Sequence, residues 1–89
     1  MIEKIDEFIN CLDTTSAKNY ARNYFNIVFT DDELNKCLPF IKVYWKDYLN
    51  VNTRQLFLNQ LTVATTQETT NKIVCIINKL LRLYNITNI

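Results

Sequence analysis

The chain contains no glycine among its 89 residues, and this absence restricts the folds that it can adopt. Glycine is the usual residue in tight hairpin turns and where the backbone approaches a phosphate group, because it has no Cβ atom. Turns in this chain must instead use Asn, Asp, Thr and Ser, whose side chains form local hydrogen bonds to the backbone. Helices joined by polar corners are the simplest fold that meets this restriction.

The longest regular pattern covers residues 65–85 and predicts an amphipathic helix. With 3.6 residues per turn, its apolar side chains occupy one half of the cylinder. They are Ile73, Val74, Ile76, Ile77, Leu80, Leu81, Leu83 and Tyr84. One neighbouring helix cannot cover a face this wide, so we expect the helix to lie in a groove between at least two others. Thr65 and Glu68 have the spacing of a capping box, which predicts where the helix begins.

Shorter segments upstream also have helical spacing, at residues 2–12, 17–29, 30–49 and 53–61. Thr30 and Glu33 form a second capping box, at which we expect the third helix to begin. Pro39 either kinks this helix or ends it near Leu38, because proline removes a backbone hydrogen bond. Asn52 is expected to cap the fourth helix. The sequence therefore predicts an all-α fold, a compact bundle of five short helices, or six if Pro39 divides the third, with a long C-terminal helix.

Length and composition favour a small cytoplasmic protein. Residues 1–89 suffice for a single helical domain, and the net charge of +1 gives no overall attraction to nucleic acid or acidic lipid. No apolar run approaches the roughly 18–20 residues that cross a bilayer, so we expect no membrane association. Three widely spaced cysteines favour reduced thiols, with Cys11 and Cys37 in the core and Cys75 at the surface. Basic neighbours on its face favour a reactive Cys75 thiolate, and an incidental surface thiol is the alternative.

The residue types of catalytic and cofactor sites are poorly represented. Histidine, the commonest general base and a frequent metal ligand, is absent from the sequence. Without glycine, the phosphate-cradling loop, the dinucleotide fingerprint and the hydrolase nucleophile elbow are excluded. The acidic residues Asp31, Asp32 and Glu33 fall in the first turn of an expected helix, where the helix dipole favours them. We therefore expect a protein that is not an enzyme and that uses no cofactor or metal.

An aromatic segment at residues 40–49 is the strongest candidate for a partner surface. The candidate residues are Phe40, Ile41, Tyr44, Trp45, Tyr48 and Leu49. Trp and Tyr concentrate binding energy at interfaces, but a central helix would bury the same rings as core. Both interpretations hold if Phe40 and Tyr44 point inward and Trp45 or Leu49 lies at an edge. In that case, replacing Trp45 by Ala should weaken binding without unfolding the domain.

Residues 54–82 have the size of a helix-turn-helix, which makes a DNA-binding regulator the alternative function. A turn at residues 62–64 would join two helices. The side chains that would face nucleic acid are Thr66, Gln67, Thr70, Asn71, Lys72, Lys79 and Arg82. Against this motif, Thr62 stands where a glycine often turns the chain, and Glu68 would bring a carboxylate toward DNA. The leading prediction is therefore an adaptor- or inhibitor-like module that binds another protein, or itself, through its aromatic face.

Overall fold

A computed structural model describes residues 2–83. They form five α-helices and one 3₁₀-helix: α1 (Ile2–Asn10), α2 (Thr14–Phe25), α3 (Asp31–Tyr44), η1 (Trp45–Leu49), α4 (Arg54–Ala64) and α5 (Gln67–Leu83). Helices account for 83% of the described residues, which contain no strand, so the predicted all-α fold is confirmed. In the same part of the chain, no helix is both long and apolar enough to cross a membrane. The predicted end of the last helix, with Tyr84 and Asn85, lies outside the described residues.

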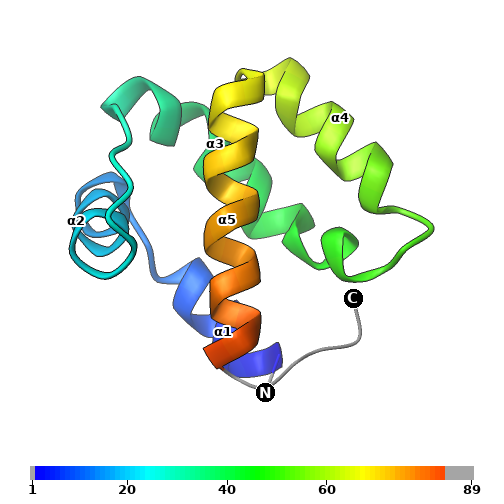
Figure 1. The fold of residues 1–89 in the computed structure, drawn as a ribbon, viewed down its shortest axis with the longest axis horizontal. Coiled ribbons are helices and arrows are strands. Elements are labelled where there is room, and N and C mark those ends of the chain that lie inside the picture. Colours follow the sequence, from blue (N-terminus) through cyan, green and yellow to red (C-terminus); the bar gives the residue numbers. More distant parts are fainter. Residues whose placement is uncertain (1, 84–89) are drawn as a thin grey trace.

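Helix α5 crosses the middle of the molecule, with α2 on one side and α4 on the other (Figure 1). Four of its polar side chains contact four different neighbours. Lys79 contacts α2, Lys72 contacts α3, Thr70 contacts α4 and Asn78 contacts η1. The prediction that this helix lies between at least two others is therefore confirmed. Leu83 departs from the predicted apolar face, because it is 68% exposed at the end of the described helix.

The residue that most clearly defines the core is Trp45, which is only 1% exposed. Its indole Nε1 donates a hydrogen bond of 2.8 Å to the Asp6 carboxylate on α1. The expected placement of Trp45 at an edge, with Tyr44 inside, is wrong, since Tyr44 is 45% exposed. The reason is that α3 passes through Pro39 without a break. Trp45 therefore continues the buried stripe of Leu34, Leu38 and Ile41, with the i, i+4, i+7, i+11 spacing of one helix face.

Helix α2 starts three residues earlier and ends four residues earlier than the spacing predicts. Its start is set by Asp13, whose carboxylate accepts a hydrogen bond of 2.8 Å from the Ser16 backbone N–H. Its end is set by Asn26, which has the left-handed angles φ 56° and ψ 37°. Glycine most often fills this position, and Asn is the common substitute. Phe29 is left outside the helix and packs into the core at 2% exposed.

Helix α3 begins at the predicted capping box. The Glu33 backbone N–H donates to the Thr30 hydroxyl at 3.1 Å, and the Thr30 N–H donates to the Glu33 carboxylate at 2.9 Å. Pro39 does not end the helix and lies on its exposed side. The predicted cap of α4 is wrong, because Thr53, and not Asn52, precedes the helix, and no side chain caps its first turn.

The connection between α4 and α5 is shorter than predicted. Helix α4 continues through Ala64, so only Thr65 and Thr66 separate the two helices. Instead of capping α5, the Thr65 hydroxyl donates to the Leu61 carbonyl oxygen at 2.7 Å. Thr66 takes the capping role, because its hydroxyl oxygen accepts from the Thr69 backbone N–H at 3.1 Å. The turn predicted at residues 62–64 is therefore helical.

All three cysteines are free thiols. Cys37 is buried and Cys75 is exposed, as predicted. Burial raises the pKa of the Cys37 thiol to about 12, so it stays protonated as a small core residue. Cys11 is exposed, contrary to the prediction, because α1 ends at Asn10 and Cys11 lies in the turn that follows.

Candidate protein interface

The residues predicted to form an aromatic partner surface do not share one exposed face. Three of them belong to the core: Ile41, Trp45 and Tyr48. Two are half-buried against the core, Phe40 and Leu49, and one is exposed, Tyr44. These aromatic side chains therefore serve mainly to pack the helices together.

Phe40 connects α3 to α4 through a row of rings. Its ring centroid lies 5.0 Å from that of Tyr44 and 5.5 Å from that of Phe57 on α4. Phe57 is only 1% exposed, so this row fixes which side of α4 faces the core. The opposite side of α4 is thereby directed outward.

The outer side of α4 carries four uncharged side chains with the spacing i, i+3, i+4, i+7 of one helix face. They are Leu56, Asn59, Gln60 and Val63, and we refer to them as the α4 stripe. All four are exposed, Leu56 at 58% and Val63 at 87%. On the helical wheel the stripe points away from Phe57 and Leu61, which face the core. The stripe is therefore free to contact another molecule without disturbing the core.

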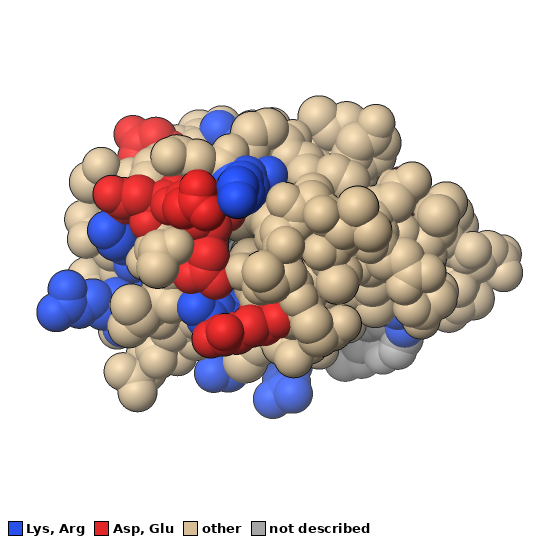
Figure 2. All heavy atoms as spheres, turned by 90° about the horizontal axis from the view of Figure 1, so that it is seen from above, with Lys and Arg blue, Asp and Glu red and all other residues tan. Residues whose placement is uncertain are grey.

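Charge is nearly absent around the α4 stripe. Between Tyr48 and Gln67 the only charged residue is Arg54, and its guanidinium folds back onto the protein. Its Nε donates a hydrogen bond of 2.8 Å to the Tyr48 carbonyl oxygen, and its Cζ lies 4.8 Å from the Tyr48 ring centroid. Figure 2 shows charged side chains gathered over the side where α2 and the start of α3 lie, whereas the side of α4 is nearly bare of them.

Exposed apolar side chains are frequent in the part of the sequence that includes α4. Of the eight large hydrophobic residues that are exposed within the described chain, five lie between positions 43 and 63. They are Val43, Tyr44, Val51, Leu56 and Val63. Val51, Leu56 and Val63 lie in the segment in which Arg54 is the only charge, so exposed apolar side chains and low charge coincide along α4.

The face predicted to contact nucleic acid is interrupted by contacts within the protein. Thr70 is 2% exposed, and its hydroxyl lies 2.9 Å from that of Thr62. Lys72 is bound to both carboxylate oxygens of Glu33, each at 3.1 Å, and Lys79 is half-buried over an aromatic ring. The predicted residues that remain exposed are Thr66, Gln67, Asn71 and Arg82. The predicted face thus presents neither Thr70 to a base edge nor a free Lys72 to a phosphate.

The Glu33 carboxylate is the centre of a polar network between α3 and α5. Its Oε2 accepts a hydrogen bond of 2.5 Å from the Thr69 hydroxyl, and Lys72 forms an ion pair with it. Burial raises the pKa of this carboxyl, but the hydrogen bonds from Thr69, the Thr30 backbone and Lys72 lower it to about 2. The carboxylate is thus ionised, and both of its oxygens have partners. We therefore interpret this network as a structural link between α3 and α5. Within residues 2–83, no three His, Cys, Asp or Glu side chains lie close enough to hold a metal ion.

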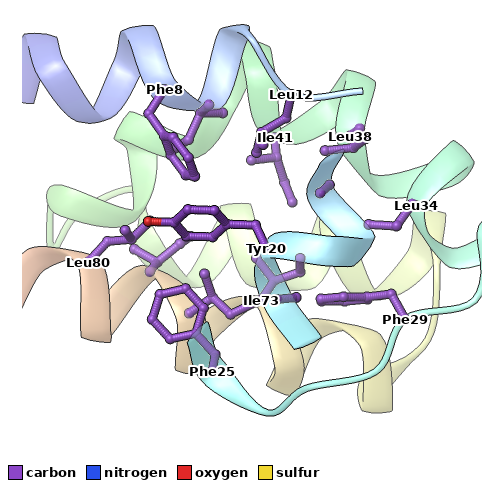
Figure 3. Close-up of a pocket in the computed structure, with 15 residues that line it drawn as sticks. Phe8, Leu12, Tyr20, Phe25, Phe29, Leu34, Leu38, Ile41, Ile73 and Leu80 are labelled. Carbon is purple, nitrogen blue, oxygen red and sulfur yellow. The ribbon is translucent and has the colours of Figure 1, made fainter. Parts of the chain in front are cut away.

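A small apolar cavity of about 60 Å³ lies among α1, α2, α3 and α5 (Figure 3). The Tyr20 ring lies between those of Phe8 and Phe25, with centroid distances of 4.5 and 5.8 Å. An apolar cavity that binds a ring such as benzene is larger, about 150 Å³. The cavity is therefore a packing gap in the core, with no room for a substrate.

A second hollow of about 440 Å³ opens between α2 and the end of α5. Its lining residues are Tyr20, Tyr24, Phe25, Lys79, Arg82 and Leu83. It is an open surface depression at the end of the described chain.

Comparisons with protein-family models, with curated proteins and with solved structures found no match. Function is therefore inferred from the exposed side chains alone. The α4 stripe was not predicted from the sequence, because only the aromatic segment at residues 40–49 was considered as a partner surface. Two signals could have found it: Leu56 and Val63 are one heptad apart, and Arg54 is the only charge between Tyr48 and Gln67.

Proposed function

We propose that the protein is a non-enzymatic, adaptor- or inhibitor-like module that binds a protein partner through the α4 stripe. The observation that supports it is the coincidence of exposed apolar side chains and absence of charge on this side of α4. Charged residues are depleted at the centres of protein interfaces, because a buried charge loses its hydration. Apolar side chains that gather on one face, instead of lying scattered, are typical of interaction surfaces.

Leu56 and Val63 would supply most of the binding energy. Complete burial of a Leu or Val side chain contributes about 1.5–3 kcal/mol. Both side chains are more than half exposed, so a partner can bury most of their apolar surface. Neither is needed to fill the core, and a substitution at either position therefore tests binding without emptying the core.

The experiment is photo-crosslinking in the cells that make the protein, with benzoylphenylalanine in place of Val63. The matched control carries the same group in place of Val28, which is 65% exposed but lies between α2 and α3. We expect discrete protein adducts from position 63 and none from position 28. Adding Leu56→Glu to the position 63 chain should abolish them, because the new charge would have to be buried. Equal adducts at both positions, or adducts unaffected by Leu56→Glu, would overturn the proposal.

A further inference from the structure

The α4 stripe has the same chemical order from either end. Leu56 and Val63 are the apolar ends, and the amides Asn59 and Gln60 lie between them. The midpoint of the four positions falls between Asn59 and Gln60. A stripe with this internal symmetry matches a copy of itself that runs in the opposite direction.

From this pattern we propose that α4 packs antiparallel against α4 of a second copy of the chain. The twofold axis passes between Asn59 and Gln60, so that Leu56 lies opposite Val63 of the second copy. Asn59 and Gln60 of both copies then surround the axis, each near its own symmetry mate, and the contact between Leu56 and Val63 recurs at the other end of the interface. The inference rests on the proposed function, because it uses the same surface and names the partner.

A second copy suits this surface because an isologous interface brings each group close to its own symmetry mate. A charged residue near the axis would meet its own sign, and the stripe contains none. A primary amide carries both a donor and an acceptor, so amides can pair with amides across the axis. Asn59 Oδ1 accepts a hydrogen bond of 2.9 Å from Gln55, which leaves its amide N–H groups to donate. Within the described residues, the Gln60 side chain forms no hydrogen bond of its own.

The expected dimer is weak. A helix of 11 residues is about 16 Å long, so the α4 pair and its flanks bury less than the roughly 1,200 Å² of a stable interface. Interfaces of that size belong to transient complexes, and we expect a dissociation constant between about 10 μM and 1 mM. The dimer must therefore be sought at high protein concentration.

Sedimentation equilibrium of the purified chain tests the association. Between about 10 μM and 1 mM, the average mass should rise from the 10.6 kDa of the monomer toward twice that value. Val63→Glu should weaken association at least about tenfold, because it places a carboxylate in the apolar end of the contact. The control is a chain with the substitution Val28→Glu, at an exposed valine that is distant from α4 in the sequence. This variant should associate as strongly as the original chain.

Disulfide trapping tests the antiparallel register. The background carries Cys11→Ser and Cys75→Ser, which remove the two exposed thiols. One variant then adds Leu56→Cys, and another, labelled with a mass tag, adds Val63→Cys. Because the antiparallel arrangement places position 56 opposite position 63 and far from its own symmetry mate, oxidation of the mixture should give mainly the mixed dimer. A parallel pair would instead favour disulfides between identical positions.

The outcomes separate this inference from the proposed function. A chain that stays monomeric up to about 1 mM, or one that dimerises without favouring the mixed disulfide, overturns the antiparallel α4 dimer. If the position 63 adducts in cells then contain a different protein, the proposed function stands with that protein as partner. If those adducts are also absent, both proposals fail.

Discussion

The ionised carboxylate of Glu33 links α3 to α5, and it should make the stability of the fold depend on pH. Its pKa falls from the ordinary value of 4.5 to about 2 in the folded protein. A difference of this size corresponds to about 3 kcal/mol in the free energy of unfolding. Glu33 and Lys72 are largely buried, with side chains 17% and 22% exposed, so solvent screening reduces this contribution only partly.

The sign of the effect follows from the direction of the shift. Folding favours the charged form of Glu33, so its contribution is complete above the unfolded pKa of 4.5. As the pH falls through the interval from 4.5 to about 2, protons bind first to the unfolded chain, and the contribution is lost. The folded protein should therefore lose this part of its stability under acid conditions.

The substitution Glu33→Gln isolates the charge. Glutamine also fits the last position of a capping box, so the hydrogen bond from Thr30 is retained. Lys72 loses its ion pair and keeps the Val28 carbonyl oxygen, at 2.8 Å, and the Phe29 ring, whose centroid lies 5.3 Å from its Nζ. We expect the free energy of unfolding to fall by about 2–3 kcal/mol at neutral pH, and by less than about 1 kcal/mol near pH 2.

Urea unfolding followed by far-ultraviolet circular dichroism, repeated from neutral pH to about pH 2, measures this difference. The control is Asp32→Asn in the same helical turn, since the Asp32 side chain is 77% exposed and pairs with Lys36 at the surface. An exposed pair of this kind contributes less than about 0.5 kcal/mol. The reasoning is refuted if Glu33→Gln is as stable as the original chain at neutral pH, or if its deficit stays constant down to pH 2.

Two further predictions concern α3 and the residue that follows it. Trp45→Ala should lower the free energy of unfolding by about 3–5 kcal/mol, because it empties a buried site. A urea midpoint close to that of the original chain would contradict the burial of this ring. Pro39→Ala should raise the free energy of unfolding by about 2 kcal/mol, because the Asn35 carbonyl regains its helical N–H donor and no buried contact is lost. A calorimetric melting temperature that stays the same or falls would argue against this account.

Periodicity predicted the fold class and α5 because both depend on local spacing. The buried side chains of α5 recur every three or four residues. Thr30 and Glu33 predict the start of α3, because their side chains form the capping hydrogen bonds there. The limits of α2 could not be predicted as well, because several polar residues between Asp13 and Ser16 compete as caps. The left-handed conformation of Asn26 likewise has no unique signal in a chain without glycine.

The burial of Trp45 could not be predicted, because the apolar and aromatic residues at positions 40–49 cover about half of the helix, and spacing alone does not tell which of them face the core. Proline weakens a helix at one hydrogen bond, but packing on both sides keeps α3 continuous, and the stripe of Leu38 and Ile41 then reaches Trp45. The pairing of Lys72 with Glu33 was inaccessible to sequence reasoning, since 39 residues separate them. Only the folded structure shows that the Lys72 ammonium group is already paired with a carboxylate of the same protein.

The central position of α5 also has a consequence for biosynthesis. Ribosomes produce α1–α4 first, and isolated helices of their length are marginally stable in water. The side chains that complete the core, Ile73, Ile77, Leu80 and Leu81, are translated only afterwards. The nascent polypeptide therefore exposes incompletely packed apolar segments until α5 has been synthesised, and segments exposed in this way are prone to aggregate. Completion of the core thus waits for the synthesis of α5.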